Sequence, residues 1–308
     1  MPSNEPRVTK AQRRDDARTK ALQMRQEQQR KERRNRMLAI GGLLVAVVVL
    51  IGVVATVLIN NKAAKDAYGK VAYGGTDTKV TAPTLDSVTK PKAADANGGI
   101  PVSKAGVGVA GSGDTTLTIY FDLQCPACDQ FDSVNAADLD TLSKEDGVTV
   151  VFQPLNFLDR SSLGTYYSTR AANALMIVAD QDPTHFMPLI TAFYKNQPAE
   201  NTSGLTDAKI ADIAKGVGVP DSVTAHFTDT VSGTYKSGDT TKNGTWRTFA
   251  PFLAAATQHA DDTLGGIATP TVFIDGKQVG KQGDQDAGFY FTPGQLLARV
   301  NAAKAAKG

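Results

Sequence analysis

The sequence of 308 residues has little cysteine, histidine and tryptophan, with 2, 3 and 1 of them respectively. Two cysteines exclude a small scaffold held by many disulfide bonds and any metal site built from three or four thiolates. The histidines, His185, His226 and His259, show no ligand-like pairing with the cysteines, so no metal site is predicted. The sequence also contains no recognisable Gly-rich phosphate loop, pair of catalytic carboxylates or Ser/His/Asp arrangement.

The net charge is small but unevenly distributed. It amounts to +2, yet residues 1–36 hold 12 Lys or Arg against 5 Asp or Glu, which leaves 21 against 26 in the rest of the chain. Because the basic excess is confined to residues 1–36 and the rest of the chain is acidic, the main domain is not expected to bind nucleic acid. Hydrophobic residues make up 41% and charged residues 21%, a globular composition that excludes a largely disordered or fibrous chain.

A long apolar run lies between Met37 and Ile59, where 23 residues carry no charge. As a helix this run is about 35 Å long, enough to cross a hydrocarbon core of about 30 Å. A cleaved signal peptide is the alternative, but its apolar region normally spans about 7–15 residues behind a short basic segment. We therefore predict an uncleaved transmembrane helix over residues 37–59.

The charges beside this run predict its orientation. Four basic residues directly precede it, namely Lys31, Arg33, Arg34 and Arg36. On the other side Lys62 and Lys65 follow, beside Asp66. Because the cytoplasmic flank of a membrane helix carries the Lys/Arg excess, we expect a cytoplasmic N-terminus and an extracytoplasmic body in the cell membrane. The basic segment is also a candidate for contact with anionic membrane lipid, although a solvated helix that only sets the topology is the simpler interpretation.

These features divide the chain into four parts. Residues 1–36 form a basic cytoplasmic segment and residues 37–59 the transmembrane helix. Residues 60–96 are rich in Lys, Ala, Thr, Gly and Asp, contain Pro83 and Pro91, and lack sustained periodicity, so a flexible tether is predicted. Residues 97–308 remain as one exported domain.

The two cysteines form a C-x-x-C motif. The β-branched and aromatic run Leu117–Phe121 predicts a buried strand, which leads into Cys125-Pro126-Ala127-Cys128 and a predicted helix. With Cys125 at the helix start and Cys128 one turn later, both sulfurs lie on one face and can form a disulfide. The helix N-terminus favours a thiolate on Cys125, and Pro126 suits the first turn because its missing N–H is not needed there.

This spacing predicts a redox pair in which Cys125 attacks and Cys128 resolves the mixed disulfide. An inert structural bridge is the alternative, but a loop of so few residues adds little stability. A c-type haem would require histidine where Asp129 stands.

A second motif follows far along the chain. Residues 271–274 and 277–279 predict two strands joined by an Asp-Gly turn, which is a β-hairpin. Pro270 precedes the first strand, where a residue that cannot donate a hydrogen bond is tolerated. Taken alone, this proline is also compatible with an ordinary loop.

Together the two motifs resemble the DsbA-like branch of the thioredoxin superfamily, particularly its membrane-anchored bacterial members. The resemblance is carried by residues 122–128 and 268–276 and extends over roughly residues 100–306. It implies an α/β thioredoxin fold with an inserted helical block at about residues 160–262. It also implies a cis peptide between Thr269 and Pro270 that faces the cysteines and binds substrate, with Pro126 and Ala127 tuning the redox pair.

The resemblance further implies a thiol–disulfide oxidoreductase without a cofactor that forms disulfides in exported proteins. Its partners would be exported protein thiols and a membrane quinone-linked oxidase for reoxidation. The same pair in a reductase or isomerase is the nearest alternative, and a tethered binding module with a structural disulfide is another. Membrane lipid is expected around the anchor, and no nucleic acid is expected.

Periodicity predicts helices near residues 170–179, 185–194, 207–214 and 249–260, and a closing helix capped by Thr292 with Pro293 in its first turn. Two positions depart from the family pattern. Ala127 stands where strong oxidases often have histidine, which predicts a less stabilised thiolate. Ile119 stands where many relatives have a buried acid, and Asp122 is the nearby candidate to replace that acid.

Overall fold

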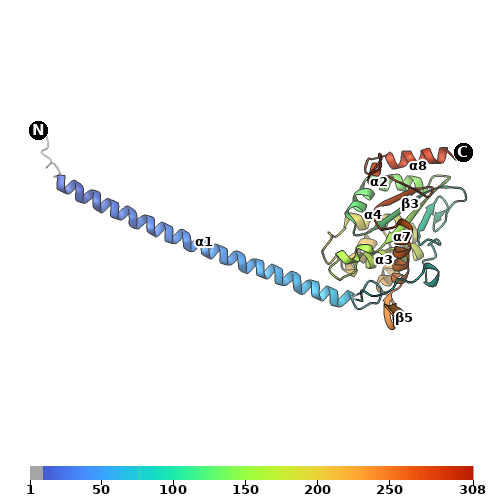
Figure 1. Ribbon diagram of the computed structural model, residues 1–308, viewed down its shortest axis with the longest axis horizontal. Coiled ribbons are helices and arrows are strands. Elements are labelled where there is room, and N and C mark those ends of the chain that lie inside the picture. Colours follow the sequence, from blue (N-terminus) through green and yellow to red (C-terminus); the bar gives the residue numbers. More distant parts are fainter. Residues whose placement is uncertain (1–9, 76, 308) are drawn as a thin grey trace. The chain divides into compact units, whose positions relative to one another are not determined.

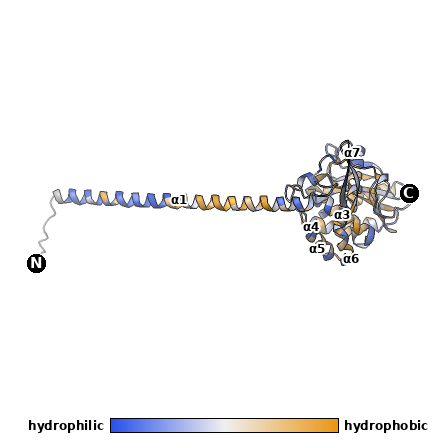
Figure 2. Ribbon diagram, turned by 90° about the horizontal axis from the view of Figure 1, so that it is seen from below, coloured by the Kyte–Doolittle hydropathy of each residue, from blue (hydrophilic) through white to orange (hydrophobic). Residues whose placement is uncertain are grey.

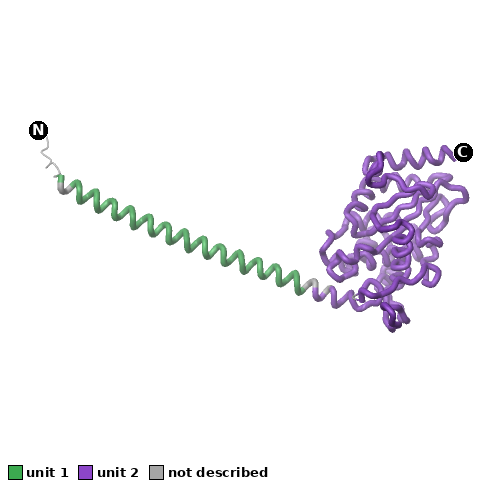
Figure 3. The backbone as a smooth tube through the Cα atoms, viewed as in Figure 1, with its two compact units in different colours: residues 1–60 green, residues 61–308 purple. Residues whose placement is uncertain are grey.

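The computed structural model describes residues 10–75 and 77–307, which form two compact units, residues 1–60 and residues 61–308 (Figure 3). The first unit is mainly helix α1, Lys10–Tyr68, whose last turns belong to the second unit. Its apolar part is visible as a continuous orange stretch in Figure 2. The apolar side chains there are exposed, and by length and composition this helix is a candidate membrane span.

The second unit is built on a mixed sheet of six strands in the order β2-β1-β4-β3-β7-β8. The strands are β1 Ile100–Ser103, β2 Gly106–Val107, β3 Thr115–Asp122, β4 Val148–Leu155, β7 Thr271–Ile274 and β8 Lys277–Val279. The central pair β3 and β4 is parallel, whereas β1 and β7 join its two sides antiparallel. The predicted strands over residues 117–121, 271–274 and 277–279 are thus confirmed.

Helices cover this sheet, as Figure 1 shows. They are α2 Pro126–Ser143, α3 Tyr167–Gln181, α4 Phe186–Lys195, α5 Asp207–Gly216, α6 Asp221–Thr224, α7 Ala250–Leu264 and α8 Gln295–Ala305, with 3₁₀ turns at Leu85–Ser87, Phe157–Ser161, Pro183–His185, Ala225–Thr228 and Phe289–Phe291. Helix α2 packs on β4, α4 and α8, and α7 packs on β4 and α3. The helices predicted between β4 and β7 are confirmed, and together they form the inserted helical block.

The inserted block also contains a β-hairpin that the sequence did not lead us to expect. Strands β5, Thr230–Ser237, and β6, Thr240–Arg247, pair antiparallel around a two-residue loop. The hairpin is mostly exposed and rich in threonine, so it lacks the alternation of apolar and polar residues that marks a strand over a core.

The prediction of a flexible tether over residues 60–96 is wrong for most of that segment. Ala72 and Tyr73 are buried, and the Tyr73 ring contacts Tyr235 and Trp246 at centroid distances of 6.2 and 5.5 Å. The N–H of Ala72 donates to the carbonyl of Thr245 over 2.8 Å. Because the hairpin offers both an aromatic surface and a free strand edge, this low-periodicity segment packs on the domain instead of remaining free.

The closing helix begins later than predicted. Helix α8 starts at Gln295 with Gly294 as its N-cap in a left-handed conformation, at φ 75°. Thr292 and Pro293 therefore precede the helix, because the glycine allows the turn that starts it. The cap predicted at Thr292 is wrong.

Candidate active site

The two cysteines lie where the central strand β3 meets helix α2. The N–H of Cys125 donates to the carbonyl of Asp122 over 3.0 Å, which makes a tight turn after the strand. Cys125 is the N-cap of α2, with Pro126 in the first turn. The N–H of Cys128 then donates to the carbonyl of Cys125 over 3.0 Å. Both cysteines are free thiols in this structure, so it describes the reduced pair.

The environment of the two thiols differs, although the residues are one turn apart. The Cys128 thiol, Thr269 and the backbone at the start of α2 stabilise a thiolate on Cys125 and lower its pKa to about 6, against the opposing effect of burial. Burial raises the pKa of Cys128 well above its ordinary value, and the neighbouring Cys125 adds to the rise. At neutral pH the pair therefore holds one nucleophilic thiolate and one buried thiol.

The loop before β7 closes the site on the other side. The peptide bond between Thr269 and Pro270 is cis. The thiol of Cys125 donates to the carbonyl oxygen of Thr269 over 3.3 Å. The structure thus brings the two distant sequence motifs together, as the resemblance implied, and leaves Pro126 exposed and Ala127 half-buried beside the pair.

Asp122 is fully buried beneath the cysteine turn. Its carboxylate accepts hydrogen bonds from the N–H of Gln124 over 2.8 Å, the N–H of Leu158 over 3.0 Å and the hydroxyl of Ser168 over 2.7 Å. Burial raises the pKa of this carboxyl to about 7, while these hydrogen bonds limit the rise. Asp122 therefore connects the cysteine turn to α3 and to the turn after β4.

Asp132 is a second buried carboxyl, one helical turn beyond Cys128 on α2. It lines a cavity of about 10 Å³ together with Cys128, Tyr194 and Ile119, which is room for about one water molecule. It also lines an adjoining groove of about 430 Å³ between α2 and α4. Burial raises the pKa of Asp132 to about 6, against a hydrogen bond donated by Thr191 over 3.2 Å.

Sequence reasoning missed Asp132 because the packing of α4 creates its surroundings. The family position for a buried acid is filled by Ile119, which is 2% exposed and lies in the wall of the same cavity. The only sequence signal for Asp132 was its spacing, four residues after Cys128 and hence on the same face of the helix.

Gln197 is another residue that the sequence did not reveal. It follows α4, and its side-chain amide donates to the carbonyls of Leu123 and Cys125, over 3.0 Å in both cases. These bonds attach the cysteine turn to the inserted block. No signal in the sequence predicts this contact, because it joins segments about 70 residues apart.

Other aromatic and polar candidates lie away from the cysteines. Tyr167 is fully buried in the core, whereas Trp246 lies on the hairpin. His185 and His226 each pair with an aspartate three residues away. Within residues 10–75 and 77–307 no cluster of three or more potential metal ligands is found.

Comparison with known proteins agrees with this geometry. A family model described as thioredoxin matches residues 110–288, more than half of the chain. A second, described as an inhibitor of host cell division protein domain, matches residues 12–73, most of which is α1. The serine/threonine-protein kinase PknE of Mycobacterium tuberculosis is 39% identical over 108 residues, which are 34% of this chain but only 19% of the kinase.

Solved structures show the same fold. MdbA, a thiol-disulfide oxidoreductase from Actinomyces oris, superposes with a TM-score of 0.52 at 20% identity, over 71% of this chain and 99% of that one. DsbA from Mycobacterium tuberculosis gives a TM-score of 0.47 at 20% identity, over 68% and 99%. At these identities the likeness concerns the fold. By its family match, its C-x-x-C pair and the facing cis-proline, the chain belongs to the thioredoxin family, and its helical block is inserted between the strands of that fold.

Proposed function

We propose that this protein is a membrane-anchored thiol–disulfide oxidoreductase that forms disulfides in exported proteins. The observation that carries the proposal is the asymmetry of the pair, since Cys125 has a pKa lowered to about 6 while Cys128 is buried with a raised pKa. An oxidase needs this asymmetry, because a stabilised thiolate makes Cys125 a good leaving group and favours the reduced pair.

In the proposed reaction a substrate thiolate attacks the Cys125 sulfur of the oxidised pair. The bond between the two cysteine sulfurs breaks, a mixed disulfide with Cys125 forms, and Cys128 leaves as a thiolate that takes up a proton. A second substrate thiolate then attacks the substrate sulfur of the mixed disulfide, and Cys125 leaves as a thiolate. The substrate has lost two electrons as its disulfide forms, and the protein pair is reduced. A membrane quinone-linked oxidase would accept these electrons.

We take Asp132 as the source of the proton for Cys128. The two side chains line the same small cavity, and Asp132 also borders the groove between α2 and α4. In the forward reaction a protonated Asp132 supplies the proton to the leaving thiolate, and in reoxidation the carboxylate accepts the proton back. Asp122, whose carboxylate is occupied by three donors, instead holds the cysteine turn in place.

Substrate is proposed to bind as an extended chain beside Thr269 and Pro270, by strand addition to the loop that faces Cys125. Pro126 and Ala127 border the attacking sulfur and tune it. Ala127 supplies neither a charge nor a side-chain donor. The lowered pKa of Cys125 therefore depends on the Cys128 thiol, Thr269 and the helix backbone.

The proposed location follows from the N-terminal helix. Residues 37–59 would cross the cell membrane once, within lipid, with basic residues 1–36 in the cytoplasm and the thioredoxin domain outside. An exported pair meets substrates in an oxidising compartment, which suits disulfide formation better than reduction.

The proposal is tested with Cys125→Ser and Cys128→Ser in the full-length protein, assayed on a reduced, unfolded model protein with oxidised glutathione as the electron acceptor. We expect Cys125→Ser to abolish exchange and Cys128→Ser to accumulate a mixed disulfide that resolves slowly. Equal residual activity in both variants would exclude the mechanism. Full biological activity after loss of both cysteines would favour a tethered binding module, and efficient reduction without oxidation would favour a reductase or isomerase.

A further inference from the structure

One edge of the β5–β6 hairpin is only partly paired. The N–H of Thr81 donates to the carbonyl of Lys236 over 3.0 Å, and the N–H of Gly238 donates to the carbonyl of Lys79 over 2.8 Å. These bonds show that the backbone of Lys236 faces away from β6. Because backbone direction alternates along an antiparallel strand, Ser232 and Thr234 face the same way. In the described part of the chain, no backbone hydrogen bond from outside the hairpin reaches these two residues.

The segment that pairs with the end of β5 then turns away. Val80 forms an antiparallel bridge with Ser237, but the chain reaches Pro83 two residues after Thr81. A proline cannot donate to a strand edge, so pairing ends there. Among residues 10–75 and 77–307, no neighbouring strand pairs with the remaining edge from Thr230 to Thr234.

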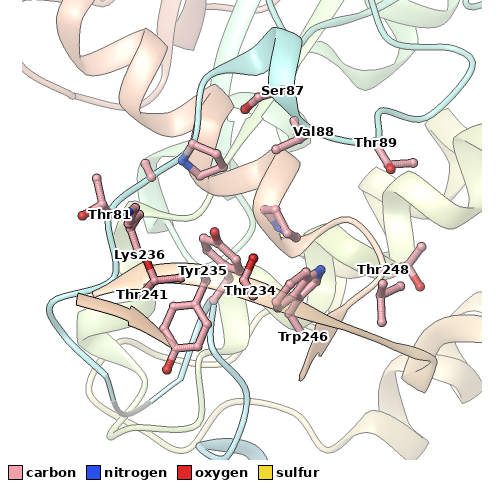
Figure 4. A pocket seen from close by; sticks show the side chains of 15 residues that line it. Thr81, Ser87, Val88, Thr89, Thr234, Tyr235, Lys236, Thr241, Trp246 and Thr248 are labelled. Atoms are coloured by element: carbon pink, nitrogen blue, oxygen red, sulfur yellow. The ribbon is translucent and has the colours of Figure 1, made fainter. Parts of the chain in front are cut away.

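A pocket of about 450 Å³ lies beside this open edge. Figure 4 shows Thr234, Tyr235 and Trp246 on the hairpin, with Ser87 and Val88 across the pocket. Its apolar lining comes from Trp246, Pro83, Pro251 and Val231, and Val231 is 44% exposed. The lining contains hydroxyl groups and a single charged residue, Lys236, so an occupant without a cationic cluster is favoured.

The chain itself shows what kind of group fits the edge. Val80 already lies on it in an antiparallel bridge with Ser237, and main-chain hydrogen bonds hold its two neighbours there. An extended polypeptide in line with them would meet the free N–H and C=O groups of Ser232 and Thr234. Its alternate side chains would then face either the Trp246 pocket or solvent.

We propose that the β5 edge and its pocket bind an extended segment of the substrate polypeptide by strand addition, with an apolar side chain against Trp246. That the bound segment belongs to a substrate rests on the proposed function. That the edge and its pocket bind an extended polypeptide does not rest on it.

The position of helix α7 gives this second site a use. The helix begins beside the pocket, where Pro251 lines it, and ends five residues before Thr269, whose carbonyl contacts Cys125. Its 15 residues correspond to about 22 Å. The five residues that follow add at most about 17 Å, and roughly twelve extended residues cover the whole length. An unfolded chain can therefore engage the pocket while a cysteine farther along reaches the redox pair, which raises the effective concentration of that cysteine.

Trp246 makes the proposal directly measurable because it is the single tryptophan of the chain. The full-length protein in detergent micelles is titrated with the cysteine-free peptide Ac-Thr-Val-Thr-Leu-Ser-Val-Lys-NH2, and tryptophan emission is recorded. Two further peptides carry N-methyl groups at the odd or at the even positions. We expect the unmodified peptide to shift the emission and one methylated peptide to bind at least about tenfold more weakly than the other, since only alternate N–H groups face the edge.

The matched variants are Thr234→Pro and Asn243→Pro. These residues are paired across the hairpin, so both prolines disturb the same position, but only the first removes an N–H from the open edge. We expect Thr234→Pro to weaken peptide binding by about tenfold and Asn243→Pro to leave it near wild type. The methylated peptides, used on the unchanged protein, keep the test valid if either variant misfolds.

Equal binding of all three peptides, or no emission change at millimolar peptide, would overturn the inference. An emission change that depends on protein concentration without peptide would assign the edge to a second copy of the chain and overturn it as well. Exchange activity is measured separately with a short dithiol substrate that cannot span the two sites. If the wild-type protein exchanges the short dithiol but does not bind the peptide, this inference alone is refuted. If it binds the peptide but does not exchange the dithiol, the proposed function alone is refuted.

Discussion

At the scale of single residues, the proposed redox site depends on two identical side chains placed in unlike surroundings. Cys125 caps α2 at the surface of the site and Cys128 lies beneath it, so one thiol loses its proton easily and the other retains it. The largest cause of the lowered pKa of Cys125 is its contact with the Cys128 thiol. The helix terminus alone therefore does not account for the reactivity of Cys125.

This cause can be tested with Cys128→Ala. We expect alkylation of Cys125 by iodoacetamide to reach half its maximal rate near pH 6 in the wild type and at a clearly higher pH in the variant, because a hydrogen bond to the thiolate is lost. Ser133→Ala, at an exposed position of α2 and with both cysteines kept, is the control. An unchanged midpoint in Cys128→Ala would mean that the helix backbone and Thr269 suffice.

A second residue-scale prediction concerns the proton of Cys128. Burial is the main reason why the pKa of Asp132 is raised to about 6. The charge of Asp129 adds to the rise, whereas Thr191 and Lys195 oppose it. We expect Asp132→Asn to slow the attack of Cys128 on a mixed disulfide at Cys125, the step of reoxidation in which the carboxylate accepts the Cys128 proton, by about 10- to 100-fold. We also expect it to remove the inflection near pH 6 from the pH–rate profile of that step.

The control for Asp132→Asn is Asp140→Asn. Asp140 also lines the groove between α2 and α4, but it is exposed and paired with Lys144. Stopped-flow measurement of mixed-disulfide resolution between pH 5 and pH 8 gives the comparison. If Asp132→Asn lowers the rate equally at every pH, or behaves like Asp140→Asn, Asp132 does not carry the proton.

At the scale of elements, the inserted block is tied together by one carboxylate between two cations. Asp207 at the start of α5 pairs with Arg170 of α3 over 2.9 Å and with Arg247 of β6 over 2.7 Å. The side chain of Arg170 is 4% exposed. We expect Asp207→Asn to lower the free energy of unfolding by about 3 kcal/mol, since it leaves buried cations without their partner.

Denaturant unfolding followed by Trp246 fluorescence measures this loss. Asp140→Asn again serves as the control, because breaking an exposed pair between neighbouring helical turns should cost no more than about 0.5 kcal/mol. A loss of similar size in both variants would show that the pairs of Asp207 contribute no more than surface charges do.

The elements differ in how far the sequence predicts them. Strand β3, helix α2 and the β7–β8 hairpin are predictable because dense apolar patterning and turn residues mark them, and they carry the cysteines and the cis-proline. The β5–β6 hairpin and the packing of residues 69–96 cannot be predicted from local patterns. Each is stabilised largely by the other, through Tyr73, Tyr235 and Trp246. For the same reason Asp132 and Gln197 acquire their roles from segments distant in the chain, which local patterns do not encode.

At the scale of the whole molecule, stability should depend on pH in a direction opposite to that of most proteins near neutrality. Burial raises the pKa of Asp122 to about 7 and those of Asp132 and Asp159 to about 6, against about 3.9 in the unfolded chain. Between these values the folded state binds more protons than the unfolded state, so the free energy of unfolding falls as pH rises from about 4 to about 7. Asp77 acts in the other direction, because its pair with Lys242 lowers its pKa to about 2, and its contribution is lost below about pH 4.

The two effects together predict maximal stability near pH 4 to 5. The measurement is denaturant unfolding between pH 3 and pH 7 on Cys125→Ser, since the lowered pKa of that thiol would otherwise add stability as pH rises above 6. We expect a higher unfolding midpoint at pH 5 than at pH 7, and a smaller difference once Asp132→Asn is added. A midpoint that rises steadily from pH 4 to pH 7 would mean that the hydrogen bonds of these carboxylates outweigh their burial, and that Asp132 is ionised at the pH where Cys128 needs a proton.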